Sequence, residues 1–149
     1  METNSIIPDV RGEVRVRIPF HDVDPANVAW HGHYFKYFEL ARCVLLERID
    51  YDYDEMARTG FVWPIVDTRA RFVKPVCFNQ DIIVHAVLRE WELRLVIDYS
   101  IVDDDGIEYT RASTTQVPLQ RDSLELHIGT PDVLAQRIQS YIEREGTRR

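Results

Sequence analysis

The sequence predicts an α+β fold in which one strongly curved antiparallel sheet wraps around a single long helix. Two observations predict it: an apolar stripe of helical period occupies residues 31–49, and runs that alternate apolar with polar residues lie on both sides of it. The chain has 149 residues and no internal repeat or low-complexity linker. We therefore expect a single domain over residues 1–149.

The central helix is predicted by apolar residues that recur at helical spacing from His31 to Ile49. A helix of that length would extend about 28 Å. Its apolar arc is wide, which suits a helix enclosed by a sheet better than one lying on a surface. The stripe consists of Tyr34, Phe38, Ala41, Leu45 and Ile49, and it is widened by Tyr37 and Val44.

The strands are predicted from segments with a period of two residues. Arg89–Glu92 is expected to turn a hairpin, and Asp103–Gly106 is a strong turn signal before the last strand. Such a sheet has exposed edges that commonly pair between subunits, so a homodimer or homotetramer is expected. The expected strands lie near residues 14–18, 66–72, 81–88, 93–102 and 107–118.

A second helix is predicted near the C-terminus. Thr130 would be its N-cap, Pro131 its first helical residue, and Asp132 would lie near the positive end of its dipole. The apolar side of this helix would consist of Leu134, Ile138 and Tyr141. The residues between the central helix and the next strand, Asp50–Asp54, read only as a turn region.

The composition narrows the possible functions. A net charge of −7 argues against non-specific binding to nucleic acid, because a phosphate surface favours a basic partner. The longest apolar runs, such as Cys43–Leu46, are far too short to span a membrane. Residues 1–8 lack the pattern of a secretory signal, so a cytoplasmic location is expected. We expect Cys43 and Cys77 to be buried, reduced thiols.

Ionisable residues gather just before the central helix, in residues 21–34, which hold three of the five histidines. Pro25 biases the backbone of Asp24 away from the helical region, and Asn27 tolerates a left-handed conformation better than most residues. The loop is thus built to hold a defined shape. An aspartate before proline also commonly bonds its own backbone, so this turn role for Asp24 stays open.

The start of the central helix supplies the second half of a candidate site. Backbone N–H groups at His31 and Gly32 are free at a helix start, where the dipole is positive. Glycine at position 32 would let a ligand approach this backbone closely. An oxygen that becomes negative during acyl transfer would be stabilised there. Asp24 would then supply the carboxylate that attacks the carbonyl or deprotonates water.

The stretch from Asp22 to Tyr34, followed by Phe38–Arg42, resembles the signature of hotdog-fold thioesterases. It is similar to the 4-hydroxybenzoyl-CoA thioesterase family and to the related Tol-Pal-associated acyl-CoA thioesterase. The resemblance implies that the chain hydrolyses an acyl-CoA to a free acid and coenzyme A without a cofactor. It also implies that Asp24 is the catalytic carboxylate, that the His31 side chain takes part in catalysis, and that the His31 and Gly32 backbone donates to the oxyanion.

Two residues depart from the family pattern. The family usually has glycine where Asn27 stands, and we expect asparagine to adopt the same turn. The family often has asparagine where His33 stands, which leaves the role of His33 open. Asp22 is expected to structure the loop or to remain solvated, with a direct role in the chemistry as the less favoured alternative. Two other functions remain: hydrolysis of acyl groups carried by an acyl carrier protein, and non-catalytic binding of acyl-CoA.

Several further residues have both a functional and a structural interpretation. The candidates for an acyl pocket, which could equally be core residues, are Trp30, Tyr34, Phe61 and Trp63. The candidates for contacts with coenzyme phosphates, which could equally form a solvated face, are Arg69, Arg71, Lys74, Arg89 and Arg94. The candidates for a metal site are His21, Asp22, Asp24, His31 and His33. No metal is expected, because His31 and His33 are two residues apart at a helix start and point in different directions.

Overall fold

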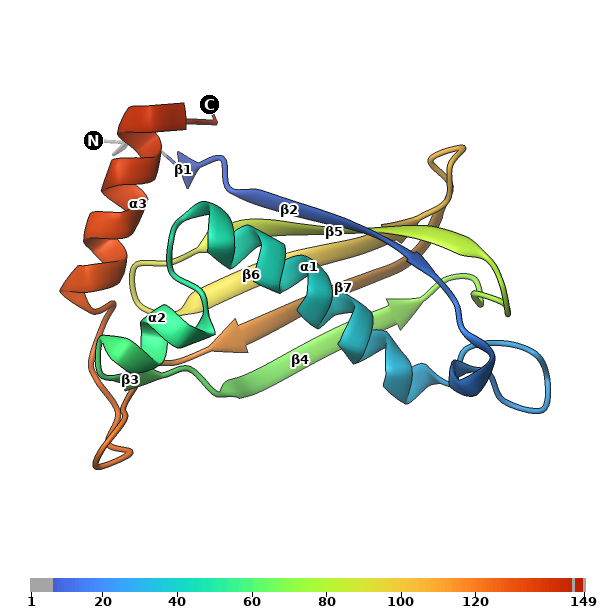
Figure 1. Ribbon diagram of the computed structural model, residues 1–149, viewed down its shortest axis with the longest axis horizontal. Coiled ribbons are helices and arrows are strands. Elements are labelled where there is room, and N and C mark those ends of the chain that lie inside the picture. The colour runs from blue at the N-terminus through green and yellow to red at the C-terminus, as the bar shows by residue number, and fades with distance from the viewer. Residues whose placement is uncertain (1–6, 146, 149) are drawn as a thin grey trace.

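The computed structural model describes residues 7–145 and 147–148, and its centre is a five-stranded antiparallel sheet. The strand order is β2-β5-β6-β7-β4 (Figure 1). The predicted α+β architecture and the hairpin between β5 and β6 are confirmed. The strands are β2 (Arg11–Arg17), β4 (Ile65–Phe72), β5 (Asp81–Glu90), β6 (Leu95–Val102) and β7 (Glu108–Gln116).

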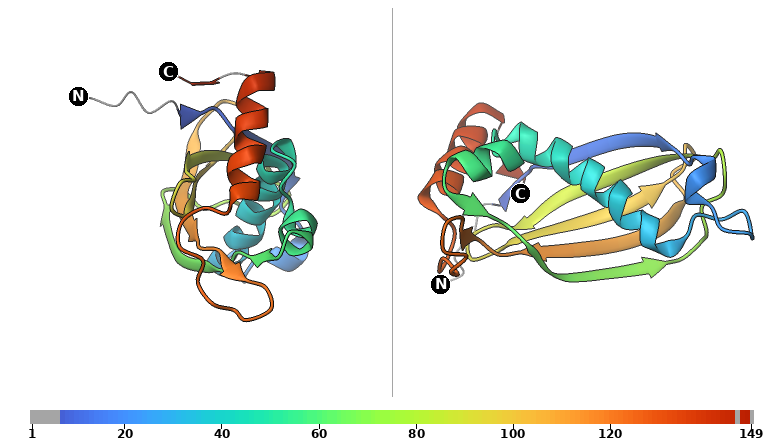
Figure 2. Two further views of the ribbon diagram at one scale, coloured as in Figure 1. Left: turned by 90° about the vertical axis from the view of Figure 1, so that its left-hand side faces the viewer. Right: turned by 60° about the horizontal axis from the view of Figure 1, so that its bottom comes forward.

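Helix α1 (Tyr34–Arg48) crosses the concave face of this sheet diagonally (Figures 1 and 2). It begins three residues later than predicted, because His31–His33 form a separate 3-10 turn, η2. Of the predicted apolar stripe, only Val44 is not fully buried. The helix packs mainly against β2 and β5, and this leaves the side of the sheet that ends in β4 less covered.

Small residues let the helix approach the sheet. A Cβ atom added at Gly12 in β2 would lie 2.4 Å from the carbonyl oxygen of Ala41 in α1, so only glycine fits there. Ala86, Ala112 and Ala70 form a row with Tyr99 across four strands, on the face turned toward α1. The close contact of α1 with β2 therefore depends on the glycine at position 12.

Two more helices lie at the end of α1 that is far from η2 (Figure 1). Helix α2 (Tyr53–Arg58) forms where the sequence predicted only a turn region, and Asp52 caps it by accepting from the N–H of Glu55 at 2.9 Å. Helix α3 (Asp132–Glu145) is confirmed. Its predicted apolar residues are all buried: Leu134, Ile138 and Tyr141.

Two local predictions were wrong. The hydroxyl of Thr130 does not cap α3 but donates to the carbonyl of Trp91, because this segment packs against the turn between β5 and β6. Cys43 and Cys77 are free thiols, as predicted, but they are not buried: Cys77 is exposed and Cys43 is half-buried. Cys77 lies in an irregular loop after β4, which the apolar core does not cover.

The remaining elements are short. η1 (Phe20–Asp22) follows β2. In two further pairs, β1 (Ile7–Pro8) pairs with β9 (Thr147–Arg148), and β3 (Phe61–Val62) pairs with β8 (Leu119–Gln120). None of the helices in the described ranges is long and apolar enough to cross a membrane.

Candidate active site

The loop that carries Asp24 folds back on itself as a tight hairpin. Val23 and Ala29 form an isolated β-bridge, and the N–H of Asp24 donates to the carbonyl of Val28 at 2.9 Å. Asn27 closes the turn by donating to the carbonyl of Asp24, and its φ of 66° is the left-handed conformation predicted for it. The backbone of Asp24 is therefore fixed by local hydrogen bonds.

A neighbouring segment holds this hairpin against the core. Ala29 donates its N–H to the carbonyl of Val76 at 2.8 Å, and Val28 forms a β-bridge with Cys77. The hydroxyl of Tyr34, in the first turn of α1, accepts from the N–H of Val76 at 3.2 Å. The loop, the segment at Val76 and the start of α1 thus form one hydrogen-bonded unit.

The carboxylate of Asp24 is half-buried. Its Oδ1 accepts from the N–H of Ala26 at 2.8 Å, which is the turn contact that an aspartate before proline commonly makes. In the part of the chain that the structure describes, no hydrogen bond engages Oδ2. One oxygen therefore orients the group while the other is available for chemistry.

The backbone of η2 offers the expected donors. Among the described residues, none accepts a hydrogen bond from the N–H of His31 or Gly32, whereas His33 donates to the carbonyl of Trp30 at 2.9 Å. The imidazole of His31 is exposed and lies 5.0 Å from the indole of Trp30, measured between ring centroids.

Gly32 has a different reason for being glycine than the sequence suggested. A Cβ atom at this position would lie 2.2 Å from the indole ring of Trp30. The neighbouring aromatic side chain thus fills the side of Gly32 on which a Cβ would lie. The N–H of Gly32 has no acceptor among the described residues, so the approach of a ligand to this backbone stays a prediction. Trp30 itself remains 49% exposed, so it forms the outer wall of η2.

Asp22 makes more side-chain polar contacts than any other described residue of the loop, and the sequence alone did not predict these contacts. Its side chain is only 3% exposed, yet it accepts from Nζ of Lys36 at 2.8 Å and from the hydroxyl of Tyr37 at 2.6 Å. Nδ1 of His33 is 3.9 Å and Nε2 of His21 is 3.6 Å from the same carboxylate. A buried carboxylate surrounded by donors is an anchor for the surrounding backbone.

Opposing effects set the pKa values in this cluster. Burial acts to raise the pKa of Asp22, but the hydrogen bonds from Lys36 and Tyr37 outweigh it and hold the pKa below its usual range. Burial and the adjacent Asp22 carboxylate raise the pKa of Tyr37. At neutral pH, Asp22 is therefore ionised and Tyr37 is a permanent donor to it.

The aromatic candidates for an acyl pocket separate in space. Trp30 lies at the site, and Tyr34 is buried beneath it with its ring 4.8 Å from that of Phe72. Trp63 is buried near α2, where its Nε1 donates to the hydroxyl of Tyr51 at 3.0 Å. Phe61, in β3, lies near Trp63 and so is also far from η2.

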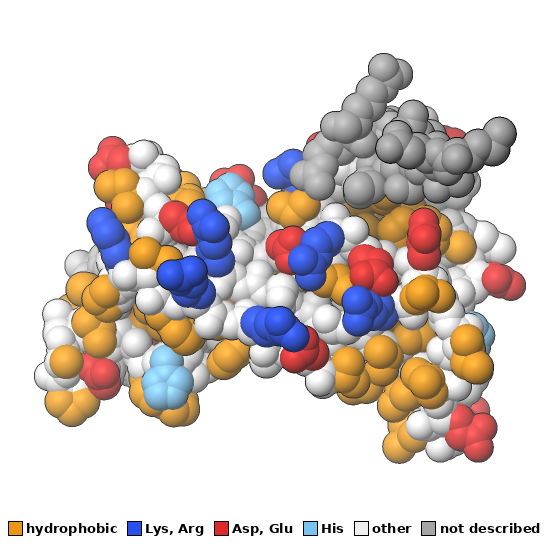
Figure 3. Space-filling model, turned by 180° about the vertical axis from the view of Figure 1, so that it is seen from behind, with side chains coloured by type: hydrophobic (Ala, Val, Ile, Leu, Met, Phe, Trp, Pro, Cys, Tyr) orange, Lys and Arg blue, Asp and Glu red, His pale blue; other side chains and the backbone are white. Residues whose placement is uncertain are grey.

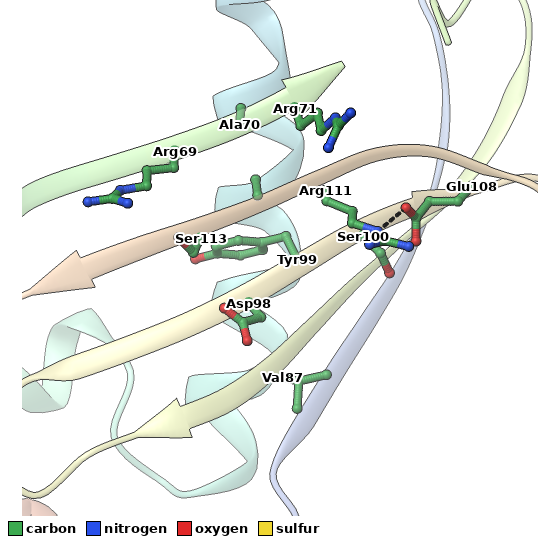
Figure 4. Close-up of a pocket in the computed structure, with 11 residues that line it drawn as sticks. Arg69, Ala70, Arg71, Val87, Asp98, Tyr99, Ser100, Glu108, Arg111 and Ser113 are labelled. Atoms are coloured by element: carbon green, nitrogen blue, oxygen red, sulfur yellow. Dashed lines mark hydrogen bonds and ion pairs between the residues drawn. The ribbon is translucent and has the colours of Figure 1, made fainter. Parts of the chain in front are cut away.

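Three of the arginine candidates, Arg69, Arg71 and Arg89, lie on the other side of the sheet. Arg94 lies in the turn between β5 and β6, where it pairs with Glu90. The outer face carries basic and acidic side chains intermixed (Figure 3). Arg69 and Arg71 line a shallow hollow of about 490 Å³ there, together with Arg111, which pairs with Glu108 (Figure 4). Arg89 pairs with Asp98 on the same face. The sheet separates these groups from α1, so the structure does not bring them to Asp24.

Comparison with known proteins assigns the family. The family model described as the Thioesterase-like superfamily matches residues 18–138. The chain belongs to this superfamily. In the described ranges, this thioesterase-family chain has no group of three or more His, Cys, Asp or Glu residues that could hold a metal ion.

Several known proteins are similar to the chain over most of its length. The Bacillus subtilis protein named "Putative acyl-CoA thioesterase YneP" is 22% identical over 114 residues, which cover 76% of this chain and 81% of that protein. The DHNA-CoA thioesterase from Staphylococcus aureus superposes with a TM-score of 0.76 and 22% identity, covering 91% of this chain and 95% of that one. Slr0204 from Synechocystis, a 1,4-dihydroxy-2-naphthoyl-CoA thioesterase, has a TM-score of 0.76, 17% identity and coverages of 87% and 96%. The predicted hotdog fold is confirmed.

Proposed function

We propose that this chain hydrolyses an acyl-CoA thioester to a free carboxylic acid and coenzyme A at the loop of Asp24 and the helix start at His31. The chain belongs to the Thioesterase-like superfamily, one relative is named "Putative acyl-CoA thioesterase", and the two solved structures named above are acyl-CoA thioesterases. The observation that carries the site is the hydrogen-bonded unit described above. It fixes a half-buried carboxylate in the same short loop that leads to the unoccupied N–H groups of His31 and Gly32.

The chemistry follows from these two groups. The thioester carbonyl oxygen would accept from the N–H groups of His31 and Gly32, whose fixed dipoles stabilise the negative charge that develops on it. Asp24 would attack the carbonyl carbon to form a mixed anhydride, which water then cleaves, or it would remove a proton from the attacking water. In either route the C–S bond breaks and coenzyme A leaves as a thiolate, which takes a proton from water.

The His31 imidazole is exposed beside Trp30, at the entrance to the same turn. From there it would orient the thioester or water. Its contribution is therefore expected to be smaller than that of Asp24, because it neither bonds to the reacting carbon nor carries the main charge on the oxyanion.

The decisive experiment compares the wild type with Asp24→Asn. Asparagine keeps an oxygen that can accept from the N–H of Ala26, so the loop should retain its shape. Release of free thiol is measured over a panel of aliphatic and aromatic acyl-CoA substrates. We expect turnover to fall by about 10³-fold or more, as for loss of an essential carboxylate. Near-normal turnover of Asp24→Asn would refute the assignment.

The same panel tests the two other functions. Matched acyl groups on coenzyme A and on an acyl carrier protein separate the two carriers by their kcat/KM values. Tight binding of acyl-CoA without thiol release over hours would indicate a binding module instead of an enzyme.

The exposure of strand β4 supports the expected homodimer or homotetramer. It is an edge strand of the sheet, and seven of its eight residues are exposed. Phe72 lies on the face toward α1, against Tyr34, yet it is 44% exposed. Val66, at a bulge near the start of the strand, is 58% exposed. A second copy that pairs along β4 would complete the sheet and cover these side chains.

A further inference from the structure

We propose that Asp22 is a positioning residue for the reaction: its buried carboxylate fastens the Asp24 loop to the first turns of α1. The inference rests on the proposed role of Asp24. It assigns no contact with substrate to Asp22, because the oxygens of this side chain are already engaged by other groups of the protein.

Asp22 contacts both halves of the site. Through its side chain it binds α1, by way of Lys36 and Tyr37. Through its backbone carbonyl it accepts from the N–H of Trp30 at 3.0 Å, directly before the donor at His31. Asp24 follows two residues later along the chain. A single residue thus connects the carboxylate loop, the oxyanion turn and the helix that supports both.

The polarity of the contacts requires a carboxylate. Lys36 and Tyr37 both act as donors, one to Oδ1 and the other to Oδ2. Asparagine has the same shape, but it would present an NH₂ group to one of these donors and lose that bond. The remaining oxygen would carry no negative charge, so its hydrogen bond to the second donor would also be weaker. Because Tyr37 is 2% exposed, water has little access to replace the missing partner.

The difference from Asp24 is one of environment. Asp22 is almost fully buried and has two strong donors, whereas Asp24 is half-buried and has one backbone contact. The first arrangement suits a rigid support and the second suits a group that must react. A displacement of a reacting group by about 1 Å can reduce turnover about 100-fold, so loosening the support should appear in kcat.

The test measures kcat, KM and thermal stability for Asp22→Asn, Lys36→Met and Tyr37→Phe. The matched control is Glu55→Gln, which removes a carboxylate that holds Arg58 and Arg137 at the opposite end of α1. All assays are run well below the lowest melting temperature. We expect Asp22→Asn to lower kcat about 10- to 100-fold with little change in KM, and the control to lose stability without losing kcat.

Coupling distinguishes positioning from general destabilisation. Combining Asp22→Asn with Lys36→Met should reduce kcat no further than Asp22→Asn alone, because both remove the same contact. A merely structural role predicts that the variants lose stability while kcat stays unchanged, and that result would overturn the inference. Should Asp22→Asn fail to fold, Lys36→Met decides the question, because Lys36 is 51% exposed and its replacement removes one contact only.

Asp24→Asn, measured in parallel, separates this inference from the proposed function. Loss of turnover in Asp24→Asn with normal kcat in Asp22→Asn refutes the positioning role alone. Near-normal turnover in Asp24→Asn overturns both, since Asp22 would then support no reacting group.

Discussion

Nε of Arg42, in α1, donates to the hydroxyl of Tyr53 at 2.6 Å, and Arg42 is buried without a carboxylate partner among the described residues. Nη1 of Arg42 donates to the hydroxyl of Tyr99 at 3.3 Å, and that hydroxyl is 2.8 Å from Oγ1 of Thr114. Burial acts to lower the pKa of Arg42, but the two tyrosines outweigh it and raise the pKa. A buried cation is thus held by neutral hydroxyl groups.

The first prediction concerns this network. Tyr99→Phe removes the hydroxyl that connects Arg42 with Thr114, and both would be left short of a partner where water has little access. The free energy of unfolding should fall by about 1–3 kcal/mol, which urea denaturation measures. Tyr109→Phe is the control, because its hydroxyl bonds to the exposed turn at Asp103. Equal losses for the two variants would contradict the prediction.

The second prediction concerns Gly32 and Trp30. In Gly32→Ala the new methyl group must displace the indole, which lies 2.2 Å from the Cβ position. The indole is the outer end of a side chain that is 49% exposed, so it can move toward solvent, and the loss of stability should stay below the roughly 1–3 kcal/mol of an overpacked core. The movement should disturb the backbone donors of η2, so kcat should decrease more clearly than stability. Thermal unfolding and thiol release measure the two effects.

A double variant checks the cause of that loss. In Trp30→Ala/Gly32→Ala the methyl group has space, and stability and kcat should recover toward those of Trp30→Ala alone. If the double variant is as impaired as Gly32→Ala, the methyl group must act on something other than the indole, and this explanation fails.

The sequence predicted those elements of the fold in which apolar residues recur with a clear helical or strand period. The stripe that includes Tyr34, Phe38 and Leu45 is buried in α1, and the alternating strands form the sheet. The short helix at Tyr53 was missed because six residues give too few turns for a recognisable period. Val66 was expected to alternate with the residues that follow it, but a bulge between Ile65 and Asp67 breaks the alternation there. Alternation also identifies a face without showing whether anything covers it.

The candidate site was predictable only in part. The sequence proposes Asp24 and His31 because loop chemistry and the family resemblance point to the same positions, and the left-handed turn predicted at Asn27 is confirmed. The burial of Asp22 was not predictable, because its contacts with Lys36 and Tyr37 arise only when the loop folds back against α1. A period in the sequence carries no information about such contacts between a loop and a helix.

The third prediction is a pH dependence of stability. The pKa of Asp22 is lower in the folded chain than its ordinary value of about 3.9, so the unfolded state binds its proton more readily. The stability that Asp22 contributes is therefore fully present above that ordinary value and is lost as the pH falls through the folded pKa. Urea denaturation from about pH 7 down to about pH 3 should show wild type and Asp22→Asn converging only at the acid end. A constant difference at every pH would contradict the assignment of the charge.

The last prediction concerns the edge strand β4. Val66→Glu and Val73→Glu place charges at positions that are 58% and 54% exposed in the single chain but would be covered in a dimer paired along β4. Burying an unpaired carboxylate at an interface is costly, so both variants should shift the protein toward monomer while the fold remains intact. Sedimentation velocity measures the shift and far-ultraviolet circular dichroism checks the fold. Leu93→Glu, at a 68% exposed position near the turn between β5 and β6, is the control and should leave the sedimentation coefficient unchanged. An unchanged oligomer in all three variants would place the contact between subunits away from β4.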